Sequence, residues 1–141
     1  MFLLVTNNSE LFKCVKCGFF IDGTALDVLI NVRSRIHLGS VLLTNPLCGN
    51  LRPNHQPFRS VLIDEKSGLV DLESLSLIEK AIEFYQSCYQ SCKIITPQNL
   101  DDSLREDYAY IDCELLRESL EQYNMISKSQ FNTAPLRTKN S

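Results

Sequence analysis

The feature that most constrains the fold of this chain is the alternation of short apolar runs with amphipathic stretches. Phe2–Thr6 is a continuous apolar run that ends in polar residues, as a buried strand does. Apolar residues then recur at helical spacing over residues 25–36, and two more apolar runs follow, Val41–Leu43 and Ser60–Ile63. This alternation predicts an α/β fold, with a small, mostly parallel four-stranded sheet flanked by helices.

The other N-terminal elements are shorter. Ser9–Val15 indicates a short helix or an irregular turn, and Phe19–Ile21 indicates a short strand. Thr24 and Asp27 have the spacing of a capping box, in which each side chain binds the other residue's backbone amide. Gly39 suits the left-handed residue that follows a helix. These signals predict a helix that begins after Thr24 and ends before Gly39.

Two helices are predicted in the C-terminal half. The first begins at Asp71 and ends before Pro97, with apolar residues at three- and four-residue steps. Ser103 and Glu106 form a second capping-box pattern, which predicts a last helix that ends at about Tyr123. The side chains of this helix that we expect to face inward are Leu104, Tyr108, Ile111 and Leu115.

The segment before the fourth strand has no helical pattern, although parallel neighbours usually need a helical crossover. The fourth strand can therefore be antiparallel, and its direction stays open at this point. Residues 1–96 are predicted to form an α/β core domain, and residues 97–124 an added C-terminal helical extension. Residues 125–141 have the composition of a flexible polar tail.

Composition and charge exclude several classes of protein. With 141 residues and a net charge of -3, the chain has the size of one domain and no strong attraction to a membrane surface. Acidic residues concentrate in residues 71–124, which disfavours nucleic-acid binding along the helices. The apolar start reaches Asn7 too soon for a signal peptide or a membrane span. We therefore expect a cytoplasmic protein whose six cysteines are free thiols.

Polar residues lie where three of the predicted strands end. The first strand ends in Thr6 and Asn7, Asp22 follows the second, and the third ends in Thr44 and Asn45. Ligands of open α/β sheets bind outside the carboxyl ends of the strands, so parallel strands would bring these residues to one rim. The candidate ligand-binding residues are Asn7, Asn8, Asp22, Thr44, Asn45, Gly49, Asn50, Arg52, Asn54 and Arg59.

The segment Thr44–Pro57 is the most function-like part of the sequence. Pro46, Pro53 and Pro57 stiffen it, and a stiff loop loses less entropy when it binds a ligand. It is also long for a strand connection, and long loops in compact domains are often functional. The alternative is that Asn, Pro and Gly are simply the residues that turns use.

Cysteine and histidine residues offer other chemistries. Cys14 and Cys17 form a CxxC, the spacing of a thiol relay, although no helix is predicted to begin at this pair as activation requires. Cys48, His55 or Asp22 could be the reactive group of a small enzyme at the rim. The sequence has no complete set of metal ligands and no nucleotide-binding motif, so neither a metal nor a cofactor is predicted.

A series of motifs, in a fixed order along the chain, carries a family resemblance. The motifs are Asp22-Gly-Thr-Ala-Leu-Asp-Val-Leu-Ile, Val32-Arg33, Ile36-His37-x-Gly39, Leu42-Leu43-Thr44, Pro46-Leu47-x-Gly49-Asn50, Pro53-Asn54, Pro57-Phe58-Arg59-Ser60 and Asp71-Leu72-Glu73-Ser74-Leu75. In this order they resemble the GrdX family, over about residues 3–90. The resemblance implies a cytoplasmic accessory protein, encoded with the glycine, sarcosine and betaine reductase genes of amino-acid-fermenting anaerobes. It implies no catalytic residue, because the family's own activity is unassigned.

The chain departs from the family pattern at Asn45, where a His is expected, and at Cys48, where a small hydroxyl residue is expected. The Cys14 and Cys17 pair and the helix after Pro97 lie outside the resemblance. We expect an accessory protein that binds a small anionic metabolite, or docks a reductase component, at the rim. The alternatives are a small enzyme acting on an acyl or phosphoryl compound there, and a thiol relay. Whether the chain is an enzyme stays open.

Overall fold

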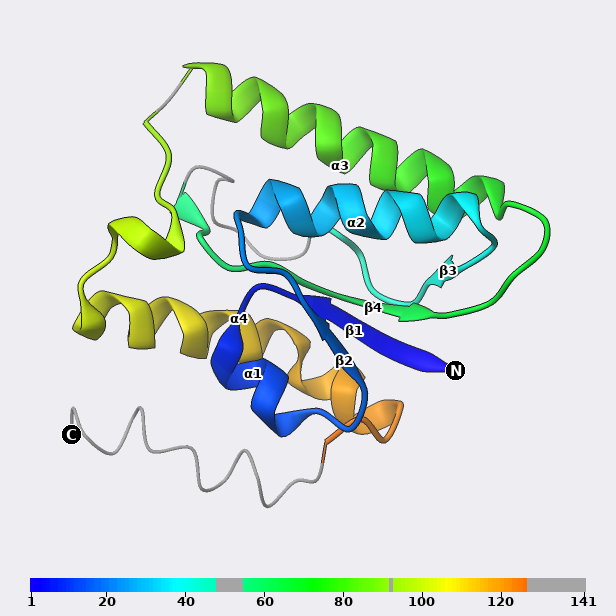
Figure 1. The fold of residues 1–141 in the computed structure, drawn as a ribbon, viewed down its shortest axis with the longest axis horizontal. Helices are drawn as coiled ribbons and strands as arrows, with labels where there is room; N and C mark the ends of the chain where they lie inside the picture. The colour runs from blue at the N-terminus through cyan, green and yellow to red at the C-terminus, as the bar shows by residue number, and fades with distance from the viewer. Residues whose placement is uncertain (48–54, 92, 127–141) are drawn as a thin grey trace.

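A computed structural model describes residues 1–47, 55–91 and 93–126 of the chain. Its strands are β1 (Phe2–Thr6), β2 (Gly18–Phe20), β3 (Val41–Leu42) and β4 (Ser60–Asp64). Its helices are α1 (Ser9–Cys14), α2 (Ala25–His37), α3 (Leu72–Ser91) and α4 (Asp102–Gln122), and a 3-10 turn, Pro97–Asn99, precedes α4. The elements form three layers, with α2 and α3 on one face of the sheet and α1 and α4 on the other (Figure 1).

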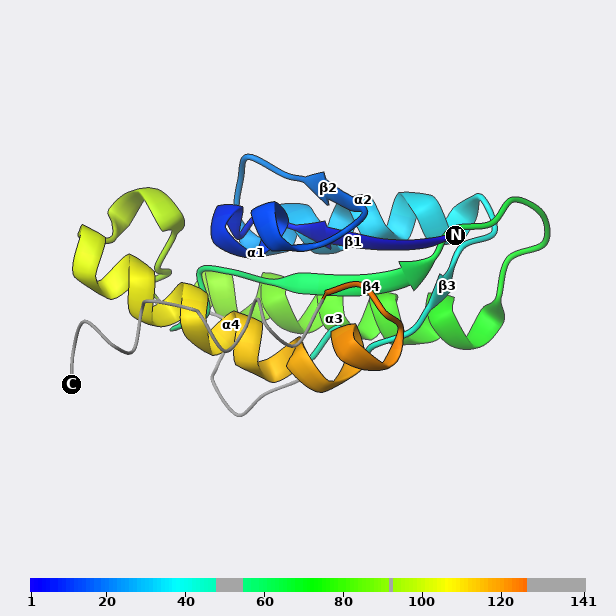
Figure 2. The same cartoon turned by 90° about the horizontal axis from the view of Figure 1, so that it is seen from below.

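The sheet is mixed, which corrects the expectation of a mostly parallel one. The strand order is β2-β1-β4-β3, as seen across the sheet in Figure 2. β1 and β2 are parallel, whereas β4 is antiparallel to both β1 and β3. An antiparallel neighbour needs no helical crossover, so the segment before β4 can insert that strand between β1 and β3. The direction of the fourth strand, which the sequence left open, is thus antiparallel.

The helix signals of the N-terminal half are confirmed. The Thr24 hydroxyl accepts the Asp27 amide at 3.2 Å, and the Asp27 carboxylate accepts the Thr24 amide at 2.9 Å, so the capping box at the start of α2 is complete. Gly39 has a φ of 117°, and a side chain there would collide with the backbone of Gly68. The segment after β1 forms the helix α1, with Asn8 as its N-cap.

The prediction for α4 is wrong in two respects. Its N-cap is Asp101, whose carboxylate accepts the Leu104 amide at 2.9 Å, so Ser103 and Glu106 do not form the expected capping box. Its buried face is displaced by one residue from the expected one, since Leu104 and Leu115 are exposed. The residues that α4 buries are Ala109, Asp112, Leu116 and Leu120. The expected stripe of α4 consists of large apolar and aromatic residues, whereas the stripe that is buried includes Asp112.

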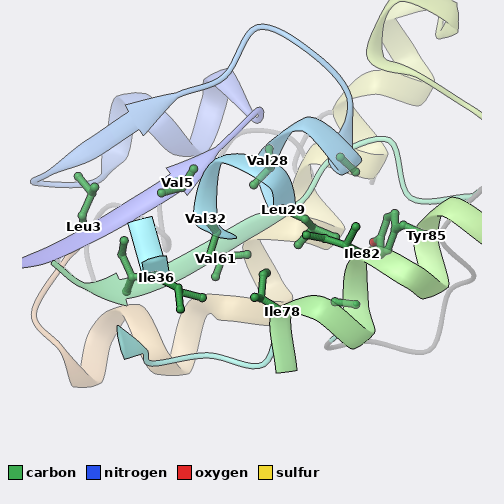
Figure 3. Packing of buried hydrophobic residues seen from close by; sticks show 13 residues of the cluster. Leu3, Val5, Val28, Leu29, Val32, Ile36, Val61, Ile78, Ile82 and Tyr85 are labelled. Carbon is green, nitrogen blue, oxygen red and sulfur yellow. The ribbon is translucent and has the colours of Figure 1, made fainter. Parts of the chain in front are cut away.

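The larger apolar core lies between the sheet and the helices α2 and α3. Leu3, Val5 and Val61 of the sheet belong to one cluster with side chains of both helices (Figure 3). The helices contribute Ala25, Val28, Leu29, Val32, Ile36, Ile78, Ala81, Ile82 and Tyr85. Full burial of one large apolar side chain stabilises a fold by about 1.5–3 kcal/mol, so this cluster anchors both helices. Tyr85 lies at one end of the cluster, and its hydroxyl group reaches the polar region described below.

The second core lies on the opposite face, under α1 and α4. Leu4 and Leu62 of the sheet pack with Leu11 of α1 and with Leu116 and Leu120 of α4. Met125 and Ile126, which follow α4, complete the cluster. Helix α4 therefore supplies much of the cover of this face. The boundary predicted at residue 97 falls in the connection between α3 and α4, and residues 127–141 of the predicted tail lie outside the described residues.

Candidate ligand-binding site

The carboxyl ends of β1, β2 and β3 lie at one end of the sheet, which we call the rim. β1 and β2 are parallel, and β3 has the same direction because β4 is antiparallel to both β1 and β3. β4 begins at the rim, where Ser60 lies opposite Thr6. Asn7, Asp22 and Asn45 therefore follow strands that all end at the rim.

Buried polar residues concentrate at the rim. Nine described polar or charged residues are buried, and seven of them lie there: Thr6, Asn7, Asn8, Gln56, Arg59, Ser60 and Asp112. Leaving such a group without a hydrogen bond costs about 1–3 kcal/mol, so a concentration of this kind depends on a network. Buried polar networks with perturbed pKa values are typical of functional sites.

Asn7 ties three segments of the rim together. Its side-chain nitrogen donates to the backbone oxygen of Gly23 at 3.0 Å and to that of Pro57 at 2.9 Å. Its side-chain oxygen accepts the backbone amide of Arg59 at 2.9 Å. The side-chain amide of Asn7 thus joins the turn before α2 to the segment before β4. Asn7 therefore fixes the positions of the backbone segments that form the rim.

Asp112 is the centre of one polar group, on the face of the sheet covered by α4. Its Oδ2 accepts the Ser60 hydroxyl at 2.6 Å and the side-chain nitrogen of Asn8 at 3.1 Å. The same nitrogen of Asn8 donates to the backbone oxygen of Ala109 at 3.1 Å. Asn8 therefore joins the start of α1 to the buried face of α4, and Asp112 joins α4 to β4.

The hydrogen bonds of this group have a defined direction. Because Ser60 donates its one proton to Asp112, the Thr6 hydroxyl must donate in the 2.6 Å contact between the two hydroxyl groups. Thr6 in turn accepts the Asn8 backbone amide at 2.9 Å. Asp112 Oδ2 is therefore an acceptor, and Oδ1 receives no hydrogen bond from the described part of the chain. A proton bound by Asp112 would therefore lie on Oδ1.

Burial raises the pKa of Asp112, whose residue is only 5% exposed. The hydrogen bonds from Ser60 and Asn8 and the charge of Arg59 lower this pKa, but burial is the larger cause. Burial also raises the pKa of the neighbouring Cys113 thiol, and the charge of Asp112 adds to that rise. This part of the rim therefore favours neutral side chains.

Arg59 is the centre of a second polar group, on the face of the sheet covered by α3. Its Nε donates to the Tyr85 hydroxyl at 2.9 Å, and one of its terminal nitrogens donates to the side-chain oxygen of Gln56. The guanidinium carbon lies 5.7 Å from the centre of the Tyr85 ring. Arg59 is only 2% exposed, and an arginine keeps its charge when buried. The group is therefore a fixed positive charge inside the rim.

A small hollow lies beside Asp112 and Gln56. It has a volume of about 10 Å³, the room of a single water molecule, and is lined by Gln56, Pro57, Phe58, Tyr108, Ile111 and Asp112. Gln56 also accepts the hydrogen bond from Arg59. The hollow is thus bordered by the carboxyl group of one polar group and by a hydrogen-bond partner of the other.

The other predicted site residues differ in their surroundings. Asp22 and Asn45 are exposed, and the side-chain oxygen of Asn45 accepts the Leu47 amide at 2.9 Å within a turn. Thr44 is half-buried, and its hydroxyl accepts the Leu62 amide at 3.1 Å. Gly49, Asn50, Arg52 and Asn54, together with Cys48, lie outside the described residues. Of the predicted ligand-binding residues, the structure thus places Asn7, Asn8 and Arg59 inside the rim, where all three are buried.

The surroundings of Cys14 do not activate its thiol. Cys14 is the last residue of α1, at the end of the helix that disfavours a thiolate. Burial raises the pKa of Cys14, and the nearby Glu10 adds to the rise, although Lys13 opposes it. Cys14 and Cys17 are both free and half-buried. His55, the expected base for Cys48, is exposed.

A larger hollow, of about 330 Å³, lies at the opposite end of the sheet. It is lined by Arg35, Leu38, Ser40, Glu65, Lys66 and Ser67. Its cations are already paired, Arg35 with Glu65 at 2.6 Å and Lys66 with Asp64 at 3.4 Å. The larger hollow is thus at one end of the sheet, whereas the buried polar groups are at the other end, the rim. We place the candidate site at the rim, because its polar groups are buried and held in one orientation, as ligand sites require.

Asp112, Gln56 and the polar role of Tyr85 were not predicted from the sequence. A signal for Asp112 does exist, because Ala109, Asp112, Leu116 and Leu120 recur at helical spacing. One aspartate inside an otherwise apolar stripe indicates a buried carboxyl group. Gln56 has no such signal in the sequence. Among the described residues, no three or more His, Cys, Asp or Glu side chains are grouped so that they could hold a metal ion.

The fold and the site define a class: a three-layer α/β protein with a mixed sheet and a polar network at the carboxyl ends of its same-direction strands. The chain belongs to the GrdX-like family, since the family model described as "GrdX-like protein" matches residues 3–121. The match extends beyond the motifs quoted above and includes most of α4. No curated protein and no solved structure matches the chain. Within the described ranges, no helix is both long and apolar enough to cross a membrane.

Proposed function

We propose that this chain is a cytoplasmic accessory protein of a glycine, sarcosine or betaine reductase system, and that it binds a small anionic metabolite at the rim. The observation that carries the binding proposal is Arg59, a buried guanidinium group fixed at the start of β4. The reductase setting is supported by the family, because the resemblance implies proteins encoded with these reductases.

The electrostatics of the rim support an anionic ligand. A charge in a poorly solvated place attracts an opposite charge more strongly than a charge in water does. Tyr85 and Gln56 hold the guanidinium group in one orientation, so little side-chain ordering is left for the binding step. Asn7 holds the backbone of Pro57 and Arg59 in place.

Isothermal titration calorimetry on the full chain tests this proposal with glycine, sarcosine, betaine and acetyl phosphate. We expect saturable binding of at least one of them, strongest for acetyl phosphate because it carries the largest negative charge. Arg59→Lys keeps the charge but loses the planar group that Tyr85 and Gln56 hold in one orientation, so it should bind about tenfold more weakly or worse. The matched control is Arg33→Lys, since Arg33 forms a surface ion pair with Glu79 at 3.4 Å.

Two results would overturn the proposal. One is the absence of saturable binding for every compound in the series. The other is an Arg59→Lys variant that is folded, as judged by circular dichroism, and binds as tightly as the unaltered chain. A ligand present at a hundred times its Kd should also add about 2.7 kcal/mol to the free energy of unfolding, which gives an independent check.

A second function is supported by Asp112. A carboxyl group with a raised pKa, beside a hollow and with Oδ1 available, has the properties of a general acid or base. The chain would then act on an acyl or phosphoryl compound at the rim. We expect Asp112→Asn to abolish hydrolysis of acetyl phosphate while the calorimetric binding is retained. Absence of turnover by the unaltered chain at any pH would reject this function and leave the binding proposal standing.

A further inference from the structure

The two edges of the sheet are protected to very different degrees. At the β3 edge, the outward amide of Leu42 donates to the hydroxyl of Ser74 at 2.9 Å, so α3 covers it. Ser74 is itself buried and donates to Asp71 at 2.7 Å. β2 forms the other edge, and β1 is its one neighbour in the sheet. An open edge strand is a template for pairing with another strand.

The hydrogen bonds to β1 show which backbone groups of β2 face outward. The Leu4 amide donates to the Cys17 oxygen at 3.1 Å, and the Ile21 amide donates to the Thr6 oxygen at 2.8 Å. Cys17 and Ile21 therefore turn their backbone groups toward β1. Because these groups alternate along a strand, Gly18 and Phe20 turn theirs outward. Within the described residues, no hydrogen bond to these outward groups is formed.

The open edge also carries exposed aromatic side chains. Phe12, Phe19 and Phe20 are 38%, 42% and 37% exposed. Phe12 packs against Phe20 on one face of the sheet, with ring centres 5.6 Å apart. On the other face, the guanidinium group of Arg35 lies 4.5 Å from the centre of the Phe19 ring. Edge strands that must stay unpaired usually carry charges, prolines or bulges, and β2 has none of these.

We propose that β2 pairs antiparallel with β2 of a second copy of this chain, with Phe19 at the two-fold axis. In this register Gly18 lies opposite Phe20 of the second copy. Both residues have outward backbone groups, so they form a hydrogen-bonded pair that exchanges both bonds. Phe19 then lies opposite Phe19 of the second copy in a non-hydrogen-bonded pair, where side chains approach most closely. The aromatic ring of Phe20 covers the backbone of the facing glycine.

The charges that flank β2 fit the same register. The backbone pairing ends before Lys16, because the Lys16 amide donates to the Met125 oxygen at 2.9 Å. An antiparallel partner still brings its Asp22 end toward Lys16, and its Lys16 end toward Asp22. Both side chains are exposed in the single chain. Opposite charges brought together at the ends of the paired strands favour the pairing, whereas like charges oppose it. The edge is thus complementary to itself in hydrogen bonding, in shape and in charge.

The pairing has a consequence for the rim. It joins two sheets into one continuous sheet and leaves the two rims at opposite ends, because the paired strands are antiparallel. It also brings Lys16 of the second copy toward Asp22, which follows β2 at the rim. The dimer therefore adds a cation to the border of each candidate site.

Sedimentation velocity of the full chain over a range of concentrations tests the dimer. We expect a dimer for the unaltered chain, and a dissociation constant at least about tenfold weaker for Phe19→Lys, which puts like charges at the two-fold axis. Phe84→Lys is the matched control, because Phe84 is 48% exposed on α3, and it should dimerise normally. Lys16→Asp and Asp22→Lys should each weaken the dimer, and the two changes combined should restore it.

A cross-link keeps the test decisive if Phe19→Lys does not fold. The α-carbons of a non-hydrogen-bonded antiparallel pair are about 4.5 Å apart, within the range that a disulfide spans. Phe19→Cys should therefore form a covalent dimer under mild oxidation, whereas Phe84→Cys should not. A chain that is monomeric at every concentration, a dimer unaffected by folded Phe19→Lys, or equal cross-linking of both cysteine variants would overturn the proposal.

Discussion

The two polar groups of the rim lie on opposite faces of the sheet and differ in how their charge depends on pH. The Arg59 group, on the α3 side, has a permanent charge held by Tyr85 and Gln56. The Asp112 group, on the α4 side, has a carboxyl group whose pKa is raised by burial. The first group is a fixed positive charge, and the second is a group that can gain or lose a proton.

This difference suggests that the two polar groups have different roles at the rim. A fixed charge suits the binding of an anion, because it costs no proton transfer when the ligand arrives. Because burial raises the pKa of Asp112, its neutral form is reached at a higher pH than in water, and that form could donate a hydrogen bond from Oδ1. Asn7 and Asn8 are adjacent residues at the end of β1, and each holds one of the two groups in place.

The largest loss of stability is expected when the support of the Arg59 group is removed. Asn7→Ala leaves two backbone oxygens and one backbone amide of the rim without their partner, so the free energy of unfolding should fall by about 3 kcal/mol. Asn45→Ala is the control, because its side chain forms a single exposed turn contact, and it should cost less than about 0.5 kcal/mol. Equal losses in urea denaturation would contradict the supporting role of Asn7.

The Asp112 group should tolerate a neutral replacement but not a deletion. Asp112→Ala leaves the Ser60 hydroxyl and the Asn8 amide without their buried acceptor, at a cost of about 2 kcal/mol. Asp112→Asn keeps an acceptor oxygen, so it should cost clearly less. Urea denaturation of both variants at neutral pH checks this order. An asparagine variant as unstable as the alanine variant would show that the charge of Asp112 stabilises the fold.

A smaller loss of stability is expected when the hydrogen bond between Arg59 and Tyr85 is removed. Tyr85→Phe removes the hydroxyl that accepts from Nε of Arg59, and a hydrogen bond to a charged group contributes about 1.5–3 kcal/mol. We expect a loss near the lower figure, since the ring stays in place. Tyr123→Phe is the control, because that ring packs edge-on against Phe2 at 5.0 Å, and its stability should be unchanged in the same denaturation assay.

The smallest effect is a dependence of stability on pH that belongs to Asp112. Its pKa is raised in the folded state above its usual value of 3.8, so the folded chain binds a proton more readily than the unfolded chain. Stability should therefore rise as the pH falls through the raised pKa toward the usual value, and should be lowest above it. Asp64 and Asp71, with lowered pKa values, have the opposite effect.

The measurement is the difference in unfolding free energy between the unaltered chain and Asp112→Asn as a function of pH. The subtraction removes the contributions of the other carboxyl groups. We expect the free energy of unfolding of the unaltered chain to rise relative to that of the variant as the pH is lowered from neutral. A difference that is flat, or that moves the other way, would show that Asp112 is ionised in the fold throughout the range.

The same comparison shows what the sequence could predict. The Arg59 group was found in part, because Arg59 follows a proline-rich segment and lies at the start of a predicted strand. The Asp112 group was not found, because the predicted inward face of the last helix was displaced by one residue from the buried face. Apolar periodicity alone could not choose between two neighbouring stripes, and the deciding factor is a hydrogen-bond network formed with residues of β1 and β4.

The fold shows the same limit. The capping box at Thr24 and the turn at Gly39 depend on neighbouring residues, so the sequence contains their full signal. The direction of β4 depends on which strands it lies between, and those contacts join residues that are far apart in the chain. The rim was predictable as an edge where strands end. Its interior depended on long-range contacts of this kind.

The most direct test of the rim as the ligand site is an NMR titration of the isotope-labelled full chain with acetyl phosphate. We expect the largest changes in backbone amide signals at Asn7, Gly23 and Arg59, where the strands end and β4 begins. Changes confined to Ser40 and Lys66, beside the larger hollow at the opposite end of the sheet, would contradict this placement, and so would a spectrum without any change.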